Sequence, residues 1–342
     1  MSCERGAASW GAVCRGAGRV AAPRGCGGFG GWASRGRGGG VSGAGGVVGV
    51  DLGGTKAAVR VVGGDGGSHD SVVLWETGAS AREDLALLAR TIERACGEVG
   101  DAEGGVVSVG VAVPATLDRS GTVVAWPGRP AWVGVDVLGA LGAMFPGASV
   151  RHGDDGDLAA LAEADAAGCG DLLYVGVGTG VGGGIVSGGL PLNSGASCEV
   201  GHVVVERGGA RCDCGRRGCV QAFASGPAIL RGAAARGGRV EGLGDVRDGV
   251  ARGEEWAVAA FEDAASALAA LVIGVGELVR PELALIGGGV TTALPGLVPA
   301  VAERVAGLGR TGHPVPSVRP AVLGAESSLH GALVLAGKGN RE

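Results

Sequence analysis

The sequence has few lysines and no excess of positive charge. Lysine occurs only at Lys56 and Lys338, so arginine supplies the other 27 of the 29 basic residues. The formal net charge is −5 at pH 7, and charges of both signs are scattered along the chain. This distribution argues against a protein that binds nucleic acid through a basic surface.

Long apolar runs are also missing. The longest strongly apolar, helix-like run extends from Ala264 to Gly276 and stops at Glu277, which is short of the roughly 18 residues that a membrane span needs. The N-terminus has arginines but no continuous apolar segment of a secretory signal. We therefore expect a cytoplasmic protein that does not enter a membrane. Because thiols stay reduced in that compartment, the nine cysteines need an explanation other than disulfides.

Proline is scarce while glycine is abundant, at 13 and 74 of 342 residues. Without a Gly-X-Y period this composition excludes collagen, and a hydrophobic content of 46% excludes a disordered chain. The scarcity of lysine beside abundant Ala, Gly and Val indicates a GC-rich coding bias. The bulk glycine count is therefore weak evidence, and only glycines in patterned positions carry weight.

Residues 1–45 differ from the rest of the chain. They hold 15 glycines, six arginines and one acid, with no helical or alternating periodicity. Such a segment buries too little apolar surface to offset its ordering entropy, so we expect a disordered Gly/Arg-rich extension. A start codon placed too early gives the same pattern, and an arginine-glycine arm that binds nucleic acid is the alternative.

Two strand–glycine turn–strand units lie about 125 residues apart and predict a duplicated α/β architecture with a cleft between its halves. The first joins strands at 47–51 and 57–62 through Gly53 and Gly54, and the second joins strands at 172–177 and 184–186 through 178–180. Further strands are expected at 71–76, 106–113, 148–151 and 283–286, and helices at 82–99, 137–144, 158–167, 254–279 and 328–336.

The turns of these units have the composition of phosphate-binding loops. In the first, Asp51 at a strand end can hold a metal ion through water, Gly53 and Gly54 let backbone amides approach anionic oxygens, and Thr55 adds a hydroxyl donor. Gly178, Thr179 and Gly180 open a second run of the same kind. An ordinary Gly-Gly hairpin turn is the alternative for either one alone. Neither fits a Walker loop or a Rossmann fingerprint.

A third glycine group, Gly287, Gly288 and Gly289, follows the strand predicted at 283–286. Glycines at this place admit a flat ligand or a close backbone, and a tight strand-to-helix turn is the alternative.

One histidine and three cysteines are spaced as H-x9-C-x-C-x4-C. These residues, His202, Cys212, Cys214 and Cys219, supply four ligands for a closed tetrahedral zinc site. Reduced buried cysteines or a disulfide are the alternatives. The remaining cysteines lack such spacing and are expected to be inert: Cys3, Cys14, Cys26, Cys96, Cys169 and Cys198.

Three acids, Asp154, Asp155 and Asp157, stand immediately ahead of the helix predicted at 158–167. From the sequence alone this placement is also what N-capping requires.

These motifs together resemble a known family. The segments 51–56, 178–184 and 281–289 resemble the two phosphate motifs and the adenosine motif of the actin-like sugar-kinase superfamily, and 201–202 with 212–219 resembles the signature of the ROK family. The resemblance covers roughly residues 46–337. It implies two ribonuclease-H-like α/β domains with an interdomain cleft, at 46–153 plus 326–337 and at 154–325, and an enzyme that forms homo-oligomers.

The resemblance also assigns roles to residues. Asp155 falls on the general base of the family's Asn-Asp-x-Asn stretch and would accept the proton of a substrate hydroxyl as that oxygen attacks the γ-phosphate of ATP. Mg²⁺ is implied as a cofactor, and a structural Zn²⁺ would shape the sugar-binding loop. ATP would be bound by Asp51, Gly53, Gly54, Thr55, Lys56, Gly178, Thr179, Gly180, Gly287, Gly288 and Gly289, and substrate by Asp154, Asp155, Glu199, His202 and Gln221.

Three positions depart from the family's pattern. Asp154 stands where glucose-type members have Asn, Gln221 stands where the zinc motif ends in Glu, and Pro127–Pro130 replaces a Pro-Asn-Leu-Pro loop. An ionised aspartate only accepts hydrogen bonds, which favours hydroxyls or an ammonium, and Gln can donate to a carbonyl. We therefore expect a glucose-like substrate with altered groups, an amino-hexose such as kanosamine or a C7-cyclitol such as valienone, phosphorylated on its exocyclic primary hydroxyl.

Other functions remain open at this stage. Neutral drift in a plain glucokinase would produce the same substitutions. The family also contains sugar-responsive transcription repressors, but these carry an N-terminal helix-turn-helix of some 60 residues, for which 1–45 shows no helical periodicity. A kinase that uses polyphosphate instead of ATP is a further possibility, although no long basic run favours it.

Overall fold

The computed structural model describes residues 45–99, 105–192 and 197–337. The expected extension at 1–45 lies outside the described residues apart from Gly45. All elements named below belong to one compact unit.

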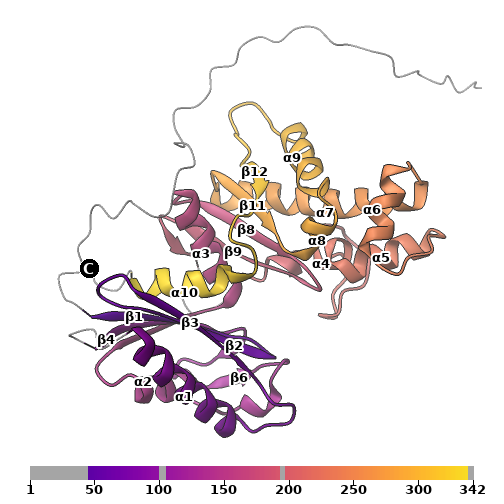
Figure 1. The fold of residues 1–342 in the computed structure, drawn as a ribbon. Helices are drawn as coiled ribbons and strands as arrows, with labels where there is room; N and C mark the ends of the chain where they lie inside the picture. Colours follow the sequence, from indigo (N-terminus) through magenta and orange to yellow (C-terminus); the bar gives the residue numbers. More distant parts are fainter. Residues whose placement is uncertain (1–44, 100–104, 193–196, 338–342) are drawn as a thin grey trace, which may run out of the picture. The chain divides into compact units, whose positions relative to one another are not determined.

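The first half of the described chain builds a five-stranded sheet (Figure 1). Its strand order is β3-β2-β1-β4-β7. β1, β2 and β3 pair antiparallel, and β1, β4 and β7 are parallel. The bounds of these strands are Gly46–Leu52 (β1), Lys56–Val62 (β2), Ser68–Leu74 (β3), Val106–Ala112 (β4) and Ser149–Gly153 (β7).

The second half repeats this arrangement. Its five-stranded sheet has the order β10-β9-β8-β11-β12, again with three antiparallel strands followed by two parallel ones. The bounds are Leu172–Val177 (β8), Val181–Ser187 (β9), Leu190–Pro191 (β10), Leu283–Gly287 (β11) and Ser317–Pro320 (β12). The matching orders confirm the predicted duplication and the two-part α/β fold class.

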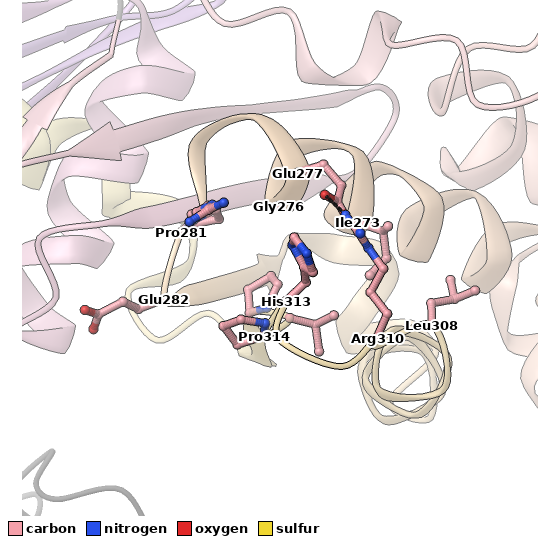
Figure 2. A pocket seen from close by; sticks show the side chains of 12 residues that line it. Ile273, Gly276, Glu277, Pro281, Glu282, Leu308, Arg310, His313 and Pro314 are labelled. Carbon is pink, nitrogen blue, oxygen red and sulfur yellow. Dashed lines mark hydrogen bonds and ion pairs between the residues drawn. The ribbon is translucent and has the colours of Figure 1, made fainter.

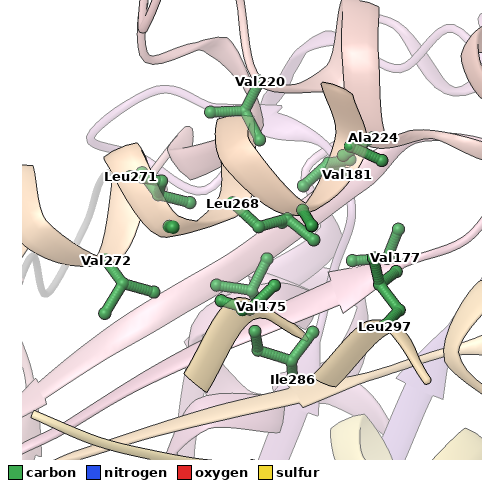
Figure 3. Close-up of a cluster of buried hydrophobic side chains, with 14 of the residues drawn as sticks. Val175, Val177, Val181, Val220, Ala224, Leu268, Leu271, Val272, Ile286 and Leu297 are labelled. Carbon is green, nitrogen blue, oxygen red and sulfur yellow. The ribbon is translucent and has the colours of Figure 1, made fainter. Parts of the chain in front are cut away.

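Alternation along the strands places a helical layer on each face of both sheets. In the second sheet Leu173, Val175 and Val177 of β8 belong to one cluster with residues of α7 (Glu255–Val279). Figure 3 shows Val175 and Val177 beside Leu268 and Leu271 of that helix. Leu172 and Tyr174, which point to the opposite face of β8, pack with α3 (Asp155–Ala167). In the first sheet α1 (Ala81–Val99) and α2 (Val137–Met144) cover one face.

Two helices exchange partners between the sheets. α3 leaves β7 of the first sheet but contacts β8 and β9 of the second, whereas the final helix α10 (Ser327–Gly337) contacts β1 and β4 of the first. Glycines permit these close crossings: a Cβ on Gly331 would lie 1.8 Å from the carbonyl oxygen of Leu158, and one on Gly110 would lie 1.8 Å from that of Ala332. Part of the glycine content therefore serves packing.

α7 is the one helix of the described residues that is long and apolar enough to cross a membrane, with a mean hydropathy of 1.8 over its best window. Half of that window is buried inside the protein, and the buried residues line the core cluster of the second sheet. The length and apolar composition of α7 are therefore explained by its place in the core.

Most predicted elements lie within a few residues of the observed ones. The predicted helix at 137–144 and strand at 172–177 coincide with α2 and β8, while the strand expected at 184–186 begins at Val181. Short elements without a clear period were not predicted: β5 (Thr116–Leu117), β6 (Val123–Ala125), β10, β12, α4 (Gln221–Ala224), α5 (Gly226–Ala235), α6 (Leu243–Ala251), α8 (Gly289–Ala293), α9 (Leu297–Gly307) and the 3-10 turns η1 (Pro130–Trp132), η2 (Val200–His202) and η3 (Gly324–Glu326).

Candidate active site

The first glycine turn, Gly53–Thr55, connects β1 and β2. Gly53 donates its amide to the carbonyl of Lys56 at 2.8 Å, and a Cβ on Gly53 would lie 2.9 Å from that oxygen. Trp75 holds the turn from outside through its indole Nε1, which donates to the Gly53 carbonyl at 2.8 Å. No acceptor within the described residues is found for the amides of Gly54 and Thr55, so these donors remain available to an anionic ligand.

The second turn, Gly178–Gly180, connects β8 and β9 at the equivalent place. Gly178 donates to the carbonyl of Gly180 at 2.8 Å and accepts from the amide of Gly226 at 2.8 Å. The turn ends at Val181, whose amide donates to Oε1 of Gln221 at 3.1 Å. Gln221, predicted as a substrate residue, thus also anchors this turn.

The glycines that follow have a different use. Gly183 and Gly184 lie within β9, and a Cβ on Gly184 would sit 2.6 Å from Cα of Asp157 in α3. They let α3 approach the strand, so the run 178–184 is a turn followed by a packing surface rather than a single phosphate loop.

The three glycines after β11 also differ from one another. Gly287 is buried, and a Cβ there would meet the Cβ of Ala321 at 2.7 Å. Gly288 has φ of 97°, which disfavours any other residue, and a Cβ would meet the carbonyl oxygen of Val177 at 2.3 Å. A Cβ on Gly289 would have nothing within 4 Å. Of the three, Gly288 faces the cavity described next.

A cavity of about 480 Å³ brings several predicted residues together. Its lining includes the second glycine turn, Gly288, Glu199, His202 and Gln221. The predicted residues Asp51, Gly53–Lys56, Asp154, Asp155, Gly287 and Gly289 are not part of this lining.

Carboxylates gather next to this cavity because parallel strands end at one edge of a sheet. Asp51 is the penultimate residue of β1, and Asp154 and Asp155 follow the end of β7. Burial, and after it the charge of Asp155, raises the pKa of Asp51 to about 6. The charge of Glu199 contributes to the raised pKa of both Asp154 and Asp155. These electrostatic couplings link residues from distant parts of the sequence to one acidic site.

Local backbone geometry fixes Asp154 and Asp155. Asp154 is the N-cap of α3 and accepts the amide of Gly156 at 3.0 Å, as the capping interpretation expects. Asp155 accepts the same amide at 2.8 Å, and its backbone carbonyl accepts from the hydroxyl of Ser328 in α10 at 3.1 Å. When Asp154 is protonated, its carboxyl group donates a hydrogen bond to the carboxylate of Asp155. Capping and a functional role are therefore compatible.

Burial dominates the electrostatics of these acids. It raises the pKa of Asp154 to about 7, with Asp155 adding to the effect, and it raises the pKa of Asp155 as well. A carboxylate with a raised pKa binds a proton more strongly and is a better base near neutral pH. The site also favours any cation that lowers its accumulated negative charge.

Asp157 and Cys198 form a contact that the sequence did not indicate. Asp157 is 2% exposed, and Cys198 donates to it from both backbone and side chain. Its Oδ1 has no partner among the described residues, and burial raises the pKa of Asp157 to about 6. Cys198, expected to be inert, thus connects α3 to the segment that carries Glu199. The only sequence feature that could have indicated a role for Asp157 is its position two residues after Asp155.

His202, Cys212, Cys214 and Cys219 converge as their spacing predicts. Their ligand atoms all lie within 4.8 Å of one another. Sγ of Cys212 is 3.6 Å from Nδ1 of His202, and the sulfurs of Cys214 and Cys219 are 3.7 Å apart. Tetrahedral ligands about 2.0–2.3 Å from zinc are separated by roughly 3.3–3.8 Å, whereas disulfide sulfurs are about 2 Å apart. The four residues can therefore hold a zinc ion.

A second cavity, of about 250 Å³, lies at the C-terminal end of α7 and contains none of the predicted site residues. Figure 2 shows Glu277, Arg310 and His313 around it, and Arg310 is paired with Glu277 at 2.6 Å. The acids Glu277 and Glu282 in its lining are balanced by Arg280 and Arg310, so we place the candidate active site at the glycine turns.

Comparisons with known proteins agree with this geometry. The family model described as ROK family matches residues 47–338. A kanosamine kinase from Amycolatopsis mediterranei is 48% identical over 85% of this chain and 95% of that protein. A glucokinase from Thermotoga maritima is 32% identical over 72% of this chain and 83% of its own length.

Solved structures lead to the same family. A ROK hexokinase from Thermus thermophilus has a TM-score of 0.76 at 31% identity, covering 86% of this chain and 98% of that one. A ROK glucokinase from Streptomyces griseus, in complex with glucose and AMPPNP, has a TM-score of 0.62 at 27% identity over 86% of this chain and 99% of that one. With its duplicated sheets, its paired glycine turns and its Cys/His cluster, the chain belongs to the ROK family and has its actin-like ATPase fold.

Proposed function

We propose that this ATP-dependent sugar kinase phosphorylates the exocyclic primary hydroxyl of an amino-hexose such as kanosamine. The observation that carries the proposal is the half-buried acid Asp154 at a position where the resemblance gives glucose-type members an asparagine. The 48% identity to a kanosamine kinase supports the same substrate class.

The charge of the site favours an ammonium group. Asp154 lies beside Asp155, Asp157 and Glu199, all of which raise or sustain its affinity for positive charge. An ammonium would donate charge-assisted hydrogen bonds to these carboxylates, which contribute about 1.5–3 kcal/mol each. A neutral hydroxyl at the same place leaves the negative charge uncompensated. We therefore expect an amino-hexose to bind more tightly than glucose.

The proposed chemistry starts with Asp155 as general base. Its carboxylate would accept the proton of the primary hydroxyl as that oxygen attacks the γ-phosphate of ATP in line. The amide of Gly156 holds the carboxylate at 2.8 Å, and its position at the start of α3 fixes its direction. Asp155 is thus oriented before substrate arrives.

The glycine turns would bind the phosphates. The amides of Gly54 and Thr55 in the first turn and of Thr179 and Gly180 in the second are donors without a partner among the described residues. Lys56 would add positive charge, and Gly287, Gly288 and Gly289 would border the adenosine. Bound Mg²⁺ would neutralise phosphate charge, and Asp51 supplies the oxygen ligand that such an ion prefers.

The substrate-side contacts we propose are Asp154, Glu199, His202 and Gln221. The last three line the same cavity. Because Oε1 of Gln221 is bound to the amide of Val181, its amide nitrogen remains to donate to a substrate oxygen. His202 would offer its second ring nitrogen, since Nδ1 faces Cys212 at 3.6 Å.

We further propose that the Cys/His cluster holds a structural Zn²⁺. Glycines shape its loop: Gly215 and Gly218 have φ of 90° and 80°, and a Cβ on Gly218 would lie 1.7 Å from the carbonyl oxygen of Glu206. Metal analysis of purified protein should find about one zinc per chain. Cys214→Ser should lose that zinc and reduce kcat/KM for the sugar, whereas Cys96→Ser should retain both. Equal zinc in both variants would disprove the site.

The domain division that we propose, 46–153 with 326–337 against 154–325, is supported by the contacts of α10 with β1 and β4. ATP and sugar would meet between the two domains. By analogy with the family we also propose a cytoplasmic homo-oligomer that acts on a small molecule and binds neither nucleic acid nor membrane.

A substrate panel tests the proposed function. The purified enzyme is assayed by coupled ADP release with kanosamine, glucosamine, glucose and valienone, and phosphorus NMR locates the phosphate. We expect kcat/KM for kanosamine to exceed that for glucose by about tenfold or more, with the phosphate on the primary hydroxyl. Glucose as the best substrate would establish the alternative, a plain glucokinase, which the 32% identical glucokinase favours.

Assays of the same purified protein also test two other candidate functions, a transcription repressor and a polyphosphate-dependent kinase. A ROK transcriptional regulator shares the fold at 21% identity, which shows the fold alone, and a purified chain with sugar kinase activity would argue against a repressor. Replacing ATP with polyphosphate in the assay decides the phosphate donor.

A further inference from the structure

A buried ion pair lies beside the loop Pro127–Pro130, one of the segments that depart from the family's pattern. Arg129 pairs with Asp84, and the two residues are only 9% and 1% exposed. Nε1 of Trp132 donates to the same carboxylate at 2.8 Å. Because a buried charge is costly unless it is paired, Asp84 determines where the guanidinium of Arg129 lies.

The position of Asp84 is itself well defined. It occupies the first turn of α1, where Ser80 and Glu83 form a capping box. The amide of Ser80 donates to Oε2 of Glu83 at 2.8 Å, and the amide of Asp84 donates to the Ser80 carbonyl at 3.1 Å. α1 therefore presents Asp84 to the loop from a fixed helix end.

Trp75 connects this ion pair with the first glycine turn. The guanidinium of Arg129 stands 5.6 Å from the centroid of the Trp75 ring, within the range of a cation–π contact. The same indole donates to the Gly53 carbonyl at 2.8 Å, and the Trp75 amide donates to the Thr55 carbonyl at 3.0 Å. One aromatic side chain thus contacts both segments.

The two backbones also touch directly. A Cβ on Gly54 would lie 3.5 Å from Cα of Gly128, and one on Gly128 would lie 3.3 Å from Cα of Gly54. Glycine on each side leaves only backbone atoms at this contact. A displacement of either segment would therefore be transmitted to the other.

We propose that Arg129 is a positioning residue that couples the loop Pro127–Pro130 to the nucleotide-side turn Gly53–Thr55 through Trp75. This inference rests on the proposed function, which places the turn at the phosphates, and it assigns the loop, one of the three departures that predict an altered substrate, to the sugar side. In this role Arg129 contacts neither the sugar nor the nucleotide. It keeps the acceptor side and the donor side of the site in one relative geometry, which in-line transfer requires.

A double-mutant cycle on nucleotide binding tests the coupling. Trp75→Phe keeps a ring beneath Arg129 but removes the hydrogen bond to Gly53, and Arg129→Lys keeps the charge but removes the planar guanidinium. The Kd of AMPPNP, measured by calorimetry without sugar, should rise about fivefold in each single variant. The double variant should weaken binding little more than either single one, because both break the same connection.

Arg60→Lys is the matched control. Arg60 forms an ion pair with Asp70 at 2.5 Å in the same sheet, and among the described residues its hydrogen bonds go to Asp70, His330 and Glu326 rather than to either loop. It should leave the AMPPNP Kd unchanged, and its thermal stability shows what loss of an ion pair does alone. If Arg129→Lys fails to fold, Asp84→Asn replaces it in the cycle.

The outcomes separate coupling from a purely structural role. An Arg129→Lys variant with lower Tm but wild-type Kd for AMPPNP would overturn the proposal, as would effects that multiply in the double variant. Because AMPPNP binding needs no turnover, these results do not depend on which sugar is phosphorylated. Failure of the proposed function would instead appear as a wild-type enzyme that binds AMPPNP but phosphorylates no sugar of the panel.

Discussion

The two glycine turns occupy the same place in two sheets of the same strand order, yet unlike contacts hold them. The turn Gly53–Thr55 is anchored by an indole that is part of a buried ion-pair cluster. The turn Gly178–Gly180 is anchored by the side-chain amide of Gln221 and the backbone of Gly226. Topology therefore fixes where a phosphate loop can lie, while the surrounding side chains decide how firmly it is held.

The ends of the parallel strands differ even more between the halves. β7 is followed by Asp154 and Asp155 at the start of α3, whereas its counterpart β12 is followed by Ala321 and Val322. Of these two strand ends only that of the first sheet is followed by acids, which open α3, and the second sheet contributes the close backbone of Gly288 at the end of β11. Under the proposed function, the acids that follow the first sheet accept the proton, and the glycines that follow the second sheet pack against the ligand.

The largest expected effect comes from removing the proposed base, Asp155, at the start of α3. Asp155→Asn should lower kcat by about 10²–10⁴-fold, because the primary hydroxyl then has no proton acceptor. KM values and zinc content should change little, since the amide of Gly156 can still be accepted by the asparagine oxygen. The coupled assay and a thermal melt measure both, and activity within tenfold of wild type would contradict this role.

A large effect on stability is expected at the end of β11 in the second sheet. Gly288→Ala places a Cβ 2.3 Å from the Val177 carbonyl oxygen at φ of 97°, which should destabilise folding by about 2 kcal/mol or more. Gly289→Ala is the adjacent control, since a Cβ there meets nothing within 4 Å and Ala favours the helix. Denaturant unfolding compares them. Equal destabilisation by both would show that crowding at Gly288 is unimportant.

These positions also show what could be read from the sequence. The strand–turn–strand units and the H-x9-C-x-C-x4-C spacing are local patterns, and the structure places their residues as predicted. The division of labour among Gly287, Gly288 and Gly289 could not be predicted, because it depends on Val177 and Ala321 from other strands. A glycine needed for packing and one needed for a ligand look the same in one dimension.

Long-range anchors were missed for the same reason. Nothing local indicates that Arg129 turns toward Asp84 of α1, or that Cys198 binds Asp157. Gln221 was interpreted only as a substrate contact, because its hydrogen bond to Val181 joins residues that are 40 positions apart in the sequence. Helices α5, α6 and α9 were also not predicted, since their short apolar stripes gain stability from packing against α7 rather than from their own period.

A moderate effect should separate the two roles of Gln221. Gln221→Ala leaves the Val181 amide without its acceptor, so the KM for ATP should rise about fivefold, as expected for one lost hydrogen bond. Gln221→Glu keeps an oxygen acceptor and should leave that KM near wild type while it changes the KM for the sugar. Steady-state kinetics with each substrate varied in turn measures this split. Equal ATP effects in both variants would mean that the second turn does not depend on this anchor.

The smallest expected effect is a pH-dependent preference between substrates, which the acids that follow β7 would produce. The pKa of Asp154 is raised to about 7, first by burial and then by Asp155, with Asp157 and Glu199 adding to it. Between pH 6 and 8 the ionised fraction of such a group rises about tenfold. The ionised form accepts from an ammonium, whereas the protonated form can donate to a hydroxyl as asparagine does.

The ratio of kcat/KM for kanosamine to kcat/KM for glucose should therefore rise up to about tenfold between pH 6 and 8, and the ratio cancels titration of the shared base Asp155. Asp154→Asn should make it flat. Since the folded pKa exceeds the unfolded value of 3.8, Asp154 favours folding less as pH rises from 4 through 7, so the same variant should be more stable than wild type at pH 8. The prediction fails if the ratio in the wild-type enzyme does not change with pH while Asp154→Asn is still more stable at pH 8. That result would mean that Asp154 is buried and titrates but does not determine substrate choice.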